Sequence, residues 1–217
     1  AVVAGHDVTA LSSASRRAFR RDVQMVYQNP FSSLDPRQRI GSIVAEPLRN
    51  YALGSASEIA AEVRTMIDRV ALPASVLSRT PRELSGGQRQ RAAIARALIL
   101  RPSVVVLDEA VSALDVTVQA QILELLEELQ RALGVSYLFI SHDLSVVRHL
   151  AHTVSVLHRG RVVESGITEQ VFADPQHDYT ISLIEAIPGG VWAAEHHSAS
   201  SIPSHATGIP DRIGAST

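Results

Sequence analysis

The apolar run from Val104 to Leu107 limits the possible folds more than any other segment of this chain. A short β-branched run without alternation is typical of a parallel strand that is buried on both faces. Asp115 is an expected N-cap, after which apolar residues recur at helical spacing as far as Leu133, and Gly134 suits the end of this helix. Val135–Ile140 predicts a second buried strand. Strand, helix and strand in this order form a βαβ unit, so we expect an α/β fold with a parallel sheet.

Further elements are predicted on both sides of this unit. Val23–Tyr27 predicts a strand that leads into a loop extending to Pro36. Helical spacing predicts a helix from Ser57, its expected N-cap, to Val70, and another over Gln88–Leu100. The remaining segments predict an Arg-rich helix at 16–21, a short helix at 144–150 and a hairpin at 153–164. They also predict two more short helices, at 168–172 and 179–186, and a disordered tail at 188–217.

The composition describes a chain with a hydrophobic core and excludes several kinds of site. Of the 217 residues, 46% are apolar and 19% are charged, which is the ordinary range for a globular protein. A net charge of −2 with 4% aromatic residues is unlike a nucleic-acid-binding surface, so we expect no nucleic-acid partner. The absence of cysteine excludes disulfides, zinc thiolate sites and iron–sulfur clusters. No apolar run approaches the roughly 18 residues that span a bilayer, so we expect a soluble or peripheral protein.

Two adjacent carboxylates, Asp108 and Glu109, follow the first predicted strand of the βαβ unit. Ligands bind at the carboxyl ends of parallel strands, so this pair is placed to serve a nucleotide. Asp108 is then a candidate ligand of Mg²⁺, directly or through water, and Glu109 a candidate for polarising an attacking water. Taken alone, the pair also fits an ordinary turn at the end of a strand.

A glycine-rich segment, Ser85-Gly86-Gly87-Gln88, opens the predicted helix that ends at Leu100. The two glycines permit a close approach of the backbone, and the free amides at a helix N-terminus attract anions. The Ser85 hydroxyl is a further donor, so the segment is a candidate phosphate site. The other interpretation is a glycine-rich N-cap that only starts the helix.

Five motifs together resemble the ATP-binding subunits of ABC transporters over approximately residues 1–187. Leu84–Gln88 is similar to the signature motif of that family, and Val104–Glu109 to its Walker B strand with the catalytic glutamate. Ser112–Asp115 resembles the D-loop, Ser141–Asp143 the switch-histidine region and Gln28 the Q-loop glutamine. Their order and spacing follow the family pattern.

The resemblance implies a RecA-like P-loop NTPase fold with an inserted helical subdomain, with ATP and Mg²⁺ as cofactors. In the family two subunits face head to tail, so each ATP lies between the Walker motifs of one subunit and the signature motif of the other. The implied catalytic residues are Glu109, His142, which contacts the γ-phosphate, and Gln28, which senses Mg²⁺ and the attacking water. The implied binding residues are Asp108 and Gln28 for Mg²⁺, Ser85, Gly86, Gly87 and Gln88 for ATP, and Asp115 for coupling the two sites.

The resemblance also implies a division of the chain into five parts. Residues 1–47 are a remnant of the nucleotide-binding core with the Q-loop, and 48–100 are a helical subdomain that ends in the signature motif and its helix. Residues 101–165 return to the core with the Walker B, D-loop and switch-histidine motifs. Residues 166–187 are C-terminal helices, and 188–217 are the tail.

Three longer segments resemble the branch of the family that imports oligopeptides, dipeptides or nickel. They are Gln24–Arg37, Ser112–Ile122 and Asp174–Thr180, although Ala110 and Asp178 stand where the branch commonly has proline. This resemblance implies a peripheral protein at the cytoplasmic face of the cell membrane that docks on permease subunits through the Gln28–Pro47 loop. A substrate-binding protein is then an indirect partner.

One family motif, the Walker A loop Gly-x-x-x-x-Gly-Lys-Ser/Thr, is missing from the sequence. All 20 of the Lys and Arg residues are Arg, so its lysine is missing as well. We therefore expect a chain that is truncated at its N-terminus. Two other functions remain open: a noncatalytic partner subunit that offers only its signature face, and a soluble ABC ATPase outside transport. The short spacing between Gln28 and Ser85, without heptads, favours transport.

Overall fold

A three-stranded parallel sheet forms the centre of the molecule. The computed structural model describes residues 1–28 and 33–187. Strands β3 (Val23–Val26), β4 (Val104–Asp108) and β5 (Ser136–Ile140) lie in the order β3-β4-β5. The α/β class and the parallel sheet expected from the sequence are confirmed.

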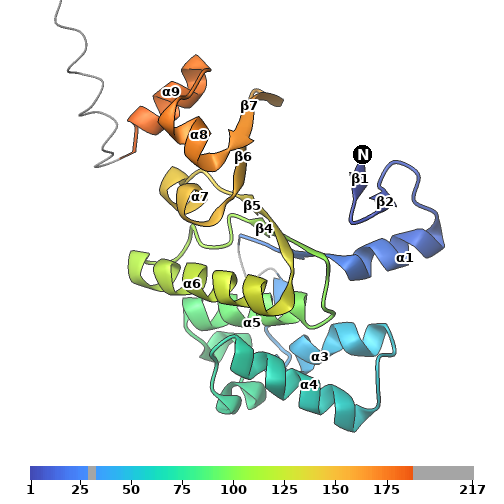
Figure 1. The fold of residues 1–217 in the computed structure, drawn as a ribbon. Helices are drawn as coiled ribbons and strands as arrows, with labels where there is room; N and C mark the ends of the chain where they lie inside the picture. The colour runs from blue at the N-terminus through green and yellow to red at the C-terminus, as the bar shows by residue number, and fades with distance from the viewer. Residues whose placement is uncertain (29–32, 188–217) are drawn as a thin grey trace, which may run out of the picture.

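One face of this sheet is covered by two helices, α5 (Gly86–Leu98) and α6 (Val116–Leu133), as Figure 1 shows. Val105 and Leu107 of β4 point to this side and are 1% and 0% exposed. Helix α6 begins at the expected N-cap, because Asp115 accepts a hydrogen bond from the Val118 amide at 3.0 Å. It ends at Gly134, whose φ of +65° is a left-handed conformation that glycine adopts without strain.

The opposite face of the sheet is exposed, which corrects the expectation of strands buried on both faces. The strand register places Met25, Val106 and Leu138 in one row, and Ile140 opposite Asp108. Met25, Leu138 and Ile140 are 37%, 56% and 46% exposed, and Val106 is half-buried. The described residues leave this face uncovered, so a continuous apolar run indicates a parallel strand here without full burial. We call Met25, Val106, Leu138 and Ile140 the bare face.

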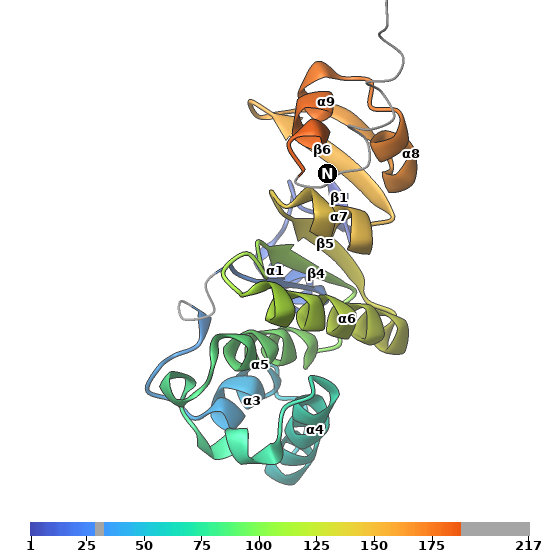
Figure 2. The ribbon, with the colours of Figure 1, turned by 90° about the vertical axis from the view of Figure 1, so that its left-hand side faces the viewer.

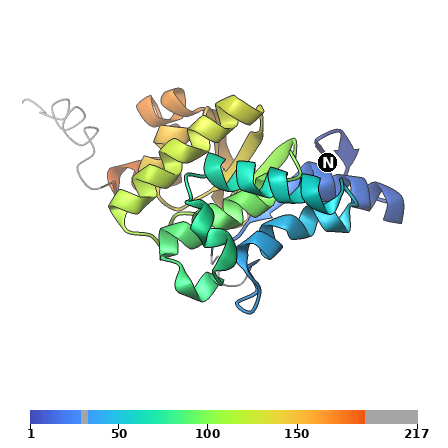
Figure 3. The same ribbon diagram turned by 90° about the horizontal axis from the view of Figure 1, so that it is seen from below.

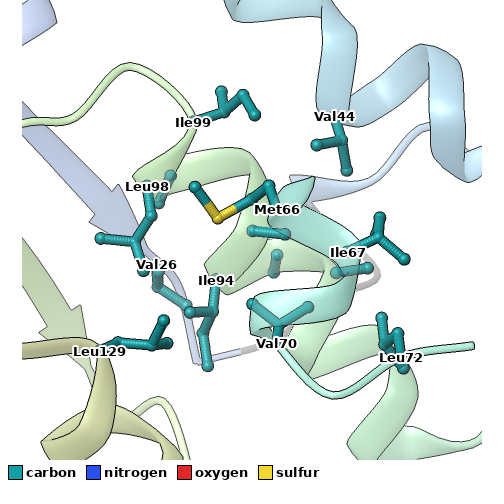
Figure 4. Packing of buried hydrophobic residues seen from close by; sticks show 14 of the residues in the cluster. Val26, Val44, Met66, Ile67, Val70, Leu72, Ile94, Leu98, Ile99 and Leu129 are labelled. Carbon is teal, nitrogen blue, oxygen red and sulfur yellow. The ribbon is translucent and has the colours of Figure 1, made fainter. Parts of the chain in front are cut away.

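A group of helices packs below the covered face of the sheet, and Figure 3 shows this group from below. It consists of α3 (Ile40–Asn50), α4 (Ala56–Arg69) and two 3₁₀ helices, η1 (Ala74–Ser78) and η2 (Pro81–Glu83). Figure 4 shows Met66 of α4 among apolar side chains of α3, α5 and β3. These side chains belong to a single buried cluster that runs from Val26 to Val146. The helices and the sheet therefore share one core.

The expected N-cap of α4, Ser57, is wrong by two residues. The Ser55 hydroxyl accepts a hydrogen bond from the Glu58 amide, and the Glu58 carboxylate accepts one from the Ser55 amide at 2.7 Å. This reciprocal capping box requires a serine three residues before the glutamate, a spacing that Ser55 has and Ser57 lacks. Helix α5, which begins within the motif Leu84–Gln88, spans Gly86–Leu98, so it starts and ends two residues earlier than the predicted Gln88–Leu100.

The N-terminal residues form a small unit beside the sheet. A two-stranded hairpin, β1 (Val2–Val3) and β2 (His6–Asp7), is followed by α1 (Ser13–Asp22). His6 Nε2 lies 2.8 Å from Asp22 Oδ2 and joins the hairpin to the end of α1. Arg17 lies over the Tyr51 ring at 4.8 Å, so α1 also rests on the end of α3.

The C-terminal elements form a second unit at the top of the molecule in Figure 2. They are α7 (Leu144–Leu150), the antiparallel hairpin β6 (Thr153–His158) and β7 (Arg161–Ile167), α8 (Thr168–Ala173) and α9 (Asp178–Glu185). Val147, Phe172 and Ile184 form its buried centre. Residues 29–32 of the predicted loop and the predicted tail at 188–217 lie outside the described residues. Within the described residues, no helix is both long and apolar enough to cross a bilayer.

Candidate functional site

The strand register brings three predicted site residues to one edge of the sheet. Val26 of β3 pairs with Leu107 of β4, so Gln28 and Glu109 each lie two residues beyond a paired position. Asp108 in turn pairs with Ile140 of β5, and His142 lies two residues beyond Ile140. Parallel strands end at the same edge, which explains why residues so distant in sequence meet there.

Glu109 is the centre of this group. Gln28 Nε2 donates a hydrogen bond to Glu109 Oε2 at 2.6 Å, and His142 Nδ1 lies 3.2 Å from Glu109 Oε1. The carboxyl side chain is 29% exposed and that of His142 is 71% exposed, so solvent reaches the group. A carboxylate at hydrogen-bonding distance from water can act as a general base, and the two neighbours fix its direction.

A fourth residue, Ser112, touches Glu109 as well. The Ser112 hydroxyl donates to the Glu109 carbonyl oxygen at 3.0 Å and lies 3.4 Å from Glu109 Oε2. Ser112 belongs to the segment that resembles the D-loop, and that resemblance implies no contact with Glu109. A serine three residues after a residue in a turn can return its hydroxyl to that carbonyl, and this spacing was the available signal. We call Gln28, Glu109, Ser112 and His142 the Glu109 cluster.

Asp108, the predicted Mg²⁺ ligand, is the last residue of β4 and is half-buried. Its carboxylate makes no hydrogen bond to any described residue and is therefore available as an oxygen ligand. The side-chain amide nitrogen of Gln28 donates a hydrogen bond to Glu109, so the side-chain amide oxygen of Gln28 remains as a second potential ligand. Mg²⁺ prefers oxygen ligands and usually retains waters and phosphate oxygens, so a pair of protein oxygens fits this ion. No group of three or more acidic, histidine or cysteine ligands occurs among residues 1–28 and 33–187.

The predicted phosphate segment, Ser85–Gln88, forms the N-terminus of α5. The Ser85 hydroxyl accepts a hydrogen bond from the Gln88 amide at 3.3 Å, and the Gln88 side chain accepts one from the Ser85 amide at 3.1 Å. The Gln88 amide is thus engaged within the helix. The Gly86 and Gly87 amides belong to the first helical turn, where backbone N–H groups have no partner within the helix.

The two glycines of this segment lie against the start of α6. A Cβ atom on Gly87 would stand 2.6 Å from Val118 Cγ1, and one on Gly86 would stand 3.4 Å from Leu114 Cδ2. The start of α5 therefore lies closer to the start of α6 than a side chain at position 87 would permit. No hydrogen bond links Ser85–Gln88 to the Glu109 cluster within the part of the chain that the structure describes. The structure brings the catalytic candidates together, and the phosphate segment packs instead against Leu114 and Val118.

Asp115 is exposed and caps α6. Its position beside the start of α5 follows from the contact between Gly87 and Val118. Its predicted role in coupling two sites stays a prediction.

A hollow lies between residues 33–38 and the helices α3 and α5. It has a volume of about 390 Å³, and its lining is Ser33, Leu34, Asp35, Pro36, Gln38, Ile43, Glu46 and Arg96. Arg96 donates a hydrogen bond to Glu46 at 3.0 Å, which ties α5 to α3. The Asp35 pKa is held below its usual value, first by the Arg37 amide and then by the Gln38 side chain. The Asp35 carboxylate is therefore charged at neutral pH.

Comparison with known protein families and proteins gives a consistent result. A family model described as "ABC transporter" matches residues 2–112. The chain is 52% identical over 186 residues to the Oligopeptide transport ATP-binding protein OppD of Mycobacterium tuberculosis, an alignment that covers 86% of this chain and 30% of that protein. It is 52% identical over 184 residues to the Dipeptide transport ATP-binding protein DppF of Haemophilus influenzae, covering 85% of this chain and 56% of that protein.

The Glutathione import ATP-binding protein GsiA of Escherichia coli is 50% identical over 184 residues, which are 85% of this chain and 30% of that protein. The chain thus spans between 30% and 56% of the length of these relatives.

Two solved structures are similar to about three quarters of the chain. One is cbiO1 from Clostridium perfringens, part of the ABC transporter complex cbiONQ, with a TM-score of 0.69 and 29% identity over 75% of this chain and 64% of that chain. The other is the ATP-binding cassette MJ0796, whose dimer in a post-hydrolysis state is bound to ADP and Pi. It has a TM-score of 0.67 and 27% identity over 76% of this chain and 72% of that chain.

Proposed function

Because the chain belongs to the ABC transporter family, we propose that it is an ATP-binding and ATP-hydrolysing subunit that powers an importer. The observation that carries the proposal is the Glu109 cluster, in which Gln28 and His142 reach the two carboxylate oxygens of Glu109 from two other strand ends. Glu109 is the general base that activates water, and His142 faces the γ-phosphate. The named relatives are an oligopeptide transport, a dipeptide transport and a glutathione import ATP-binding protein. Short peptides are therefore the proposed cargo, with nickel as the alternative within the same branch.

ATP and Mg²⁺ are the proposed cofactors. Asp108 and the Gln28 amide oxygen hold Mg²⁺, which neutralises phosphate charge when bound. Ser85, Gly86, Gly87 and Gln88 offer the N-terminus of α5 to an ATP held by a second ATP-binding subunit in a head-to-tail dimer. Asp115 couples the two sites. The sequence contains no lysine, so in this proposal the loop that grips the β- and γ-phosphates comes from outside these 217 residues.

The proposed docking surface for a permease is the 390 Å³ hollow between Ser33 and Arg96. Most of its lining, from Ser33 to Glu46, belongs to the Gln28–Pro47 loop to which the family resemblance assigns docking. The ion pair between Glu46 and Arg96 is part of its lining. Docking there places the chain as a peripheral protein at the cytoplasmic face of the membrane, with a substrate-binding protein as an indirect partner. The boundaries proposed for the parts of the chain remain 1–47, 48–100, 101–165, 166–187 and 188–217.

A second candidate function is supported by the same lack of lysine. In this alternative the chain is a noncatalytic partner that supplies only Ser85–Gln88 to the site of another subunit. The two functions differ in their dependence on Glu109. ATP hydrolysis by this chain requires Glu109, whereas a noncatalytic partner supports hydrolysis in the other subunit without it.

The test uses vesicles that contain a purified oligopeptide permease, its second ATP-binding subunit and this chain. We expect peptide-stimulated ATP hydrolysis that falls when Glu46→Arg reverses the charge in the hollow. The matched control is Glu62→Arg, because Glu62 makes an equivalent 3.0 Å ion pair with Arg101 on the side of α4. Equal loss with both variants would contradict docking at the hollow. Vesicles without stimulated hydrolysis would contradict the proposed function.

A further inference from the structure

Glu109 has an uncommon backbone conformation. Its φ is +46°, in the left-handed region that residues with a side chain seldom occupy. Such a conformation is strained and persists only where surrounding contacts hold it. The Glu109 amide is held first, because it donates to the Ile140 carbonyl at 2.9 Å and so continues the pairing of β4 with β5.

The other side of Glu109 is held by Ser112. The Ser112 amide and the Ser112 hydroxyl both donate to the Glu109 carbonyl, at 3.1 and 3.0 Å. Ala110 and Val111, between them, are 2% and 3% exposed, so the turn is anchored in the core. The hydroxyl has one proton, and its 3.0 Å bond to the carbonyl is shorter than its 3.4 Å approach to Glu109 Oε2. The hydroxyl therefore acts first on the turn and second on the carboxylate.

Ser112 differs in this respect from the other members of the Glu109 cluster. Gln28 and His142 contact only the carboxylate, and they come from other strands. Within residues 1–28 and 33–187, Ser112 is the only residue whose side chain contacts both the backbone carbonyl and the carboxylate of Glu109. It links the strained turn to the direction in which the carboxylate points.

We propose that Ser112 is a positioning residue that orients the Glu109 carboxylate toward the attacking water. This inference rests on the proposed function, because it assigns Glu109 as the general base. A base that is turned by a small angle still binds the same substrate but abstracts the proton less often. The loss of the Ser112 hydroxyl therefore lowers kcat and leaves the KM for ATP unchanged.

The first experiment measures kcat and KM for ATP in the assembled transporter. We expect Ser112→Ala to lower kcat about tenfold, with KM within about twofold of the wild-type value. Ser112→Thr retains the hydroxyl, and the exposed position of Ser112 has room for a methyl group, so at least half of the activity returns. The matched control is Ser182→Ala in α9, which removes an equivalent bond from a serine hydroxyl to the carbonyl three residues earlier. Equal activity of Ser112→Ala and wild type would overturn the proposal.

A second comparison separates positioning from a general structural effect. In a Glu109→Gln background the base is already lost, so Ser112→Ala should cause no further decrease of the residual rate. A further tenfold decrease there would show that Ser112 acts independently of Glu109 and would overturn the proposal.

Hydrogen exchange of the backbone amides provides a readout that does not need ATP hydrolysis. We expect Ser112→Ala to speed exchange at the Glu109 and Ser112 amides, while Ser182→Ala leaves them unchanged. If no variant and no wild-type complex hydrolyses ATP, the proposed function fails, and exchange still decides whether Ser112 holds the turn. Unchanged exchange with Ser112→Ala would overturn the proposal in either case.

Discussion

Gly87 on α5 and Val118 on α6 stand so close that a Cβ atom on Gly87 would lie 2.6 Å from Val118 Cγ1. Real Cβ atoms do not make contacts of this length, so the absence of a side chain at Gly87 is what permits the approach. The close packing joins the first turn of the signature helix to the helix that Asp115 caps. A motif that the sequence suggests for phosphate binding thus also has a packing requirement.

This contact predicts an unusual sign for one substitution. Alanine in place of a helical glycine ordinarily stabilises by about 1 kcal/mol. At Gly87 the clash with a stiff valine should reverse this and destabilise by about 1–3 kcal/mol, as overpacking does. The free energy of unfolding in urea measures the effect.

Two further variants complete this test. Gly86→Ala is the matched control, because a Cβ there would meet only the end of Leu114 at 3.4 Å. Val118→Ala removes the Cγ1 atom, so the double variant Gly87→Ala/Val118→Ala should be more stable than the sum of the single effects predicts. A Gly87→Ala protein as stable as wild type would contradict the packing.

A second prediction concerns Glu109 as the catalytic carboxylate. Glu109→Gln keeps the shape of the side chain but removes the basic group, and its amide nitrogen can no longer accept a hydrogen bond as the carboxylate oxygen does. In the assembled transporter, ATP binding should remain near the wild-type level while turnover falls by about 10²-fold or more, as expected for loss of a general base. Asp108→Asn should instead weaken binding in the presence of Mg²⁺. A Glu109→Gln complex with most of the wild-type ATPase rate would assign the base to another residue.

The sequence predicts much of this molecule because its elements are defined by local patterns. The run Val104–Leu107, the Asp115 cap and Gly134 specify a strand and a helix without reference to the rest of the fold. The family resemblance implies roles for Gln28 and Glu109 near the attacking water, and their hydrogen bond is a finding of the structure. It depends on strand register, which no local pattern encodes.

Other features were missed for physical reasons. The exposure of Leu138 and Ile140 depends on what covers the sheet, whereas the apolar run reports only that they are apolar. Ser57 lies closest to the start of the apolar pattern of α4. The cap depends instead on the three-residue spacing from Ser55 to Glu58, which apolar periodicity does not report. The Ser112 bond depends on the left-handed turn at Glu109, which propensity does not favour for glutamate.

A third prediction follows from the capping box of α4. Hydrogen bonds from the Ser55 amide and then the Ser55 hydroxyl hold the pKa of Glu58 below its usual value of 4.5. Because the folded-state pKa is the lower one, the contribution of Glu58 to stability is present above pH 4.5 and is lost as the pH falls through the folded-state pKa. Urea unfolding should therefore show that Glu58→Ala is less stable than wild type at neutral pH, and that the difference shrinks in acid.

The control for this effect is Glu124→Ala, an exposed glutamate on α6 without a cap to complete. Its stability relative to wild type should not depend on pH in this way. A pH-independent difference for Glu58→Ala would show that the carboxylate bond does not stabilise the helix start.

A fourth prediction concerns the bare face. An exposed apolar patch on a sheet favours association with another surface, whereas single exposed apolar residues are ordinary. Leu138→Ser with Ile140→Thr should therefore raise the monomeric fraction of the purified chain, measured by light scattering at equal concentration. Val116→Thr is the control, since Val116 is 83% exposed but stands alone at the start of α6. Equal behaviour of the two variants would mean that the bare face does not drive association.

Calorimetric titration of the purified chain with ATP and Mg²⁺ measures whether these residues bind nucleotide without a second subunit. Charge-assisted phosphate contacts contribute about 1.5–3 kcal/mol each, and the sequence contains neither the lysine nor the glycine pattern of the phosphate-gripping loop. We therefore expect that the chain alone does not bind ATP at micromolar concentrations. Addition of a subunit with an intact Walker A loop should restore binding that Ser85→Ala weakens. Micromolar ATP binding by the monodisperse 217-residue chain without a partner would contradict the account.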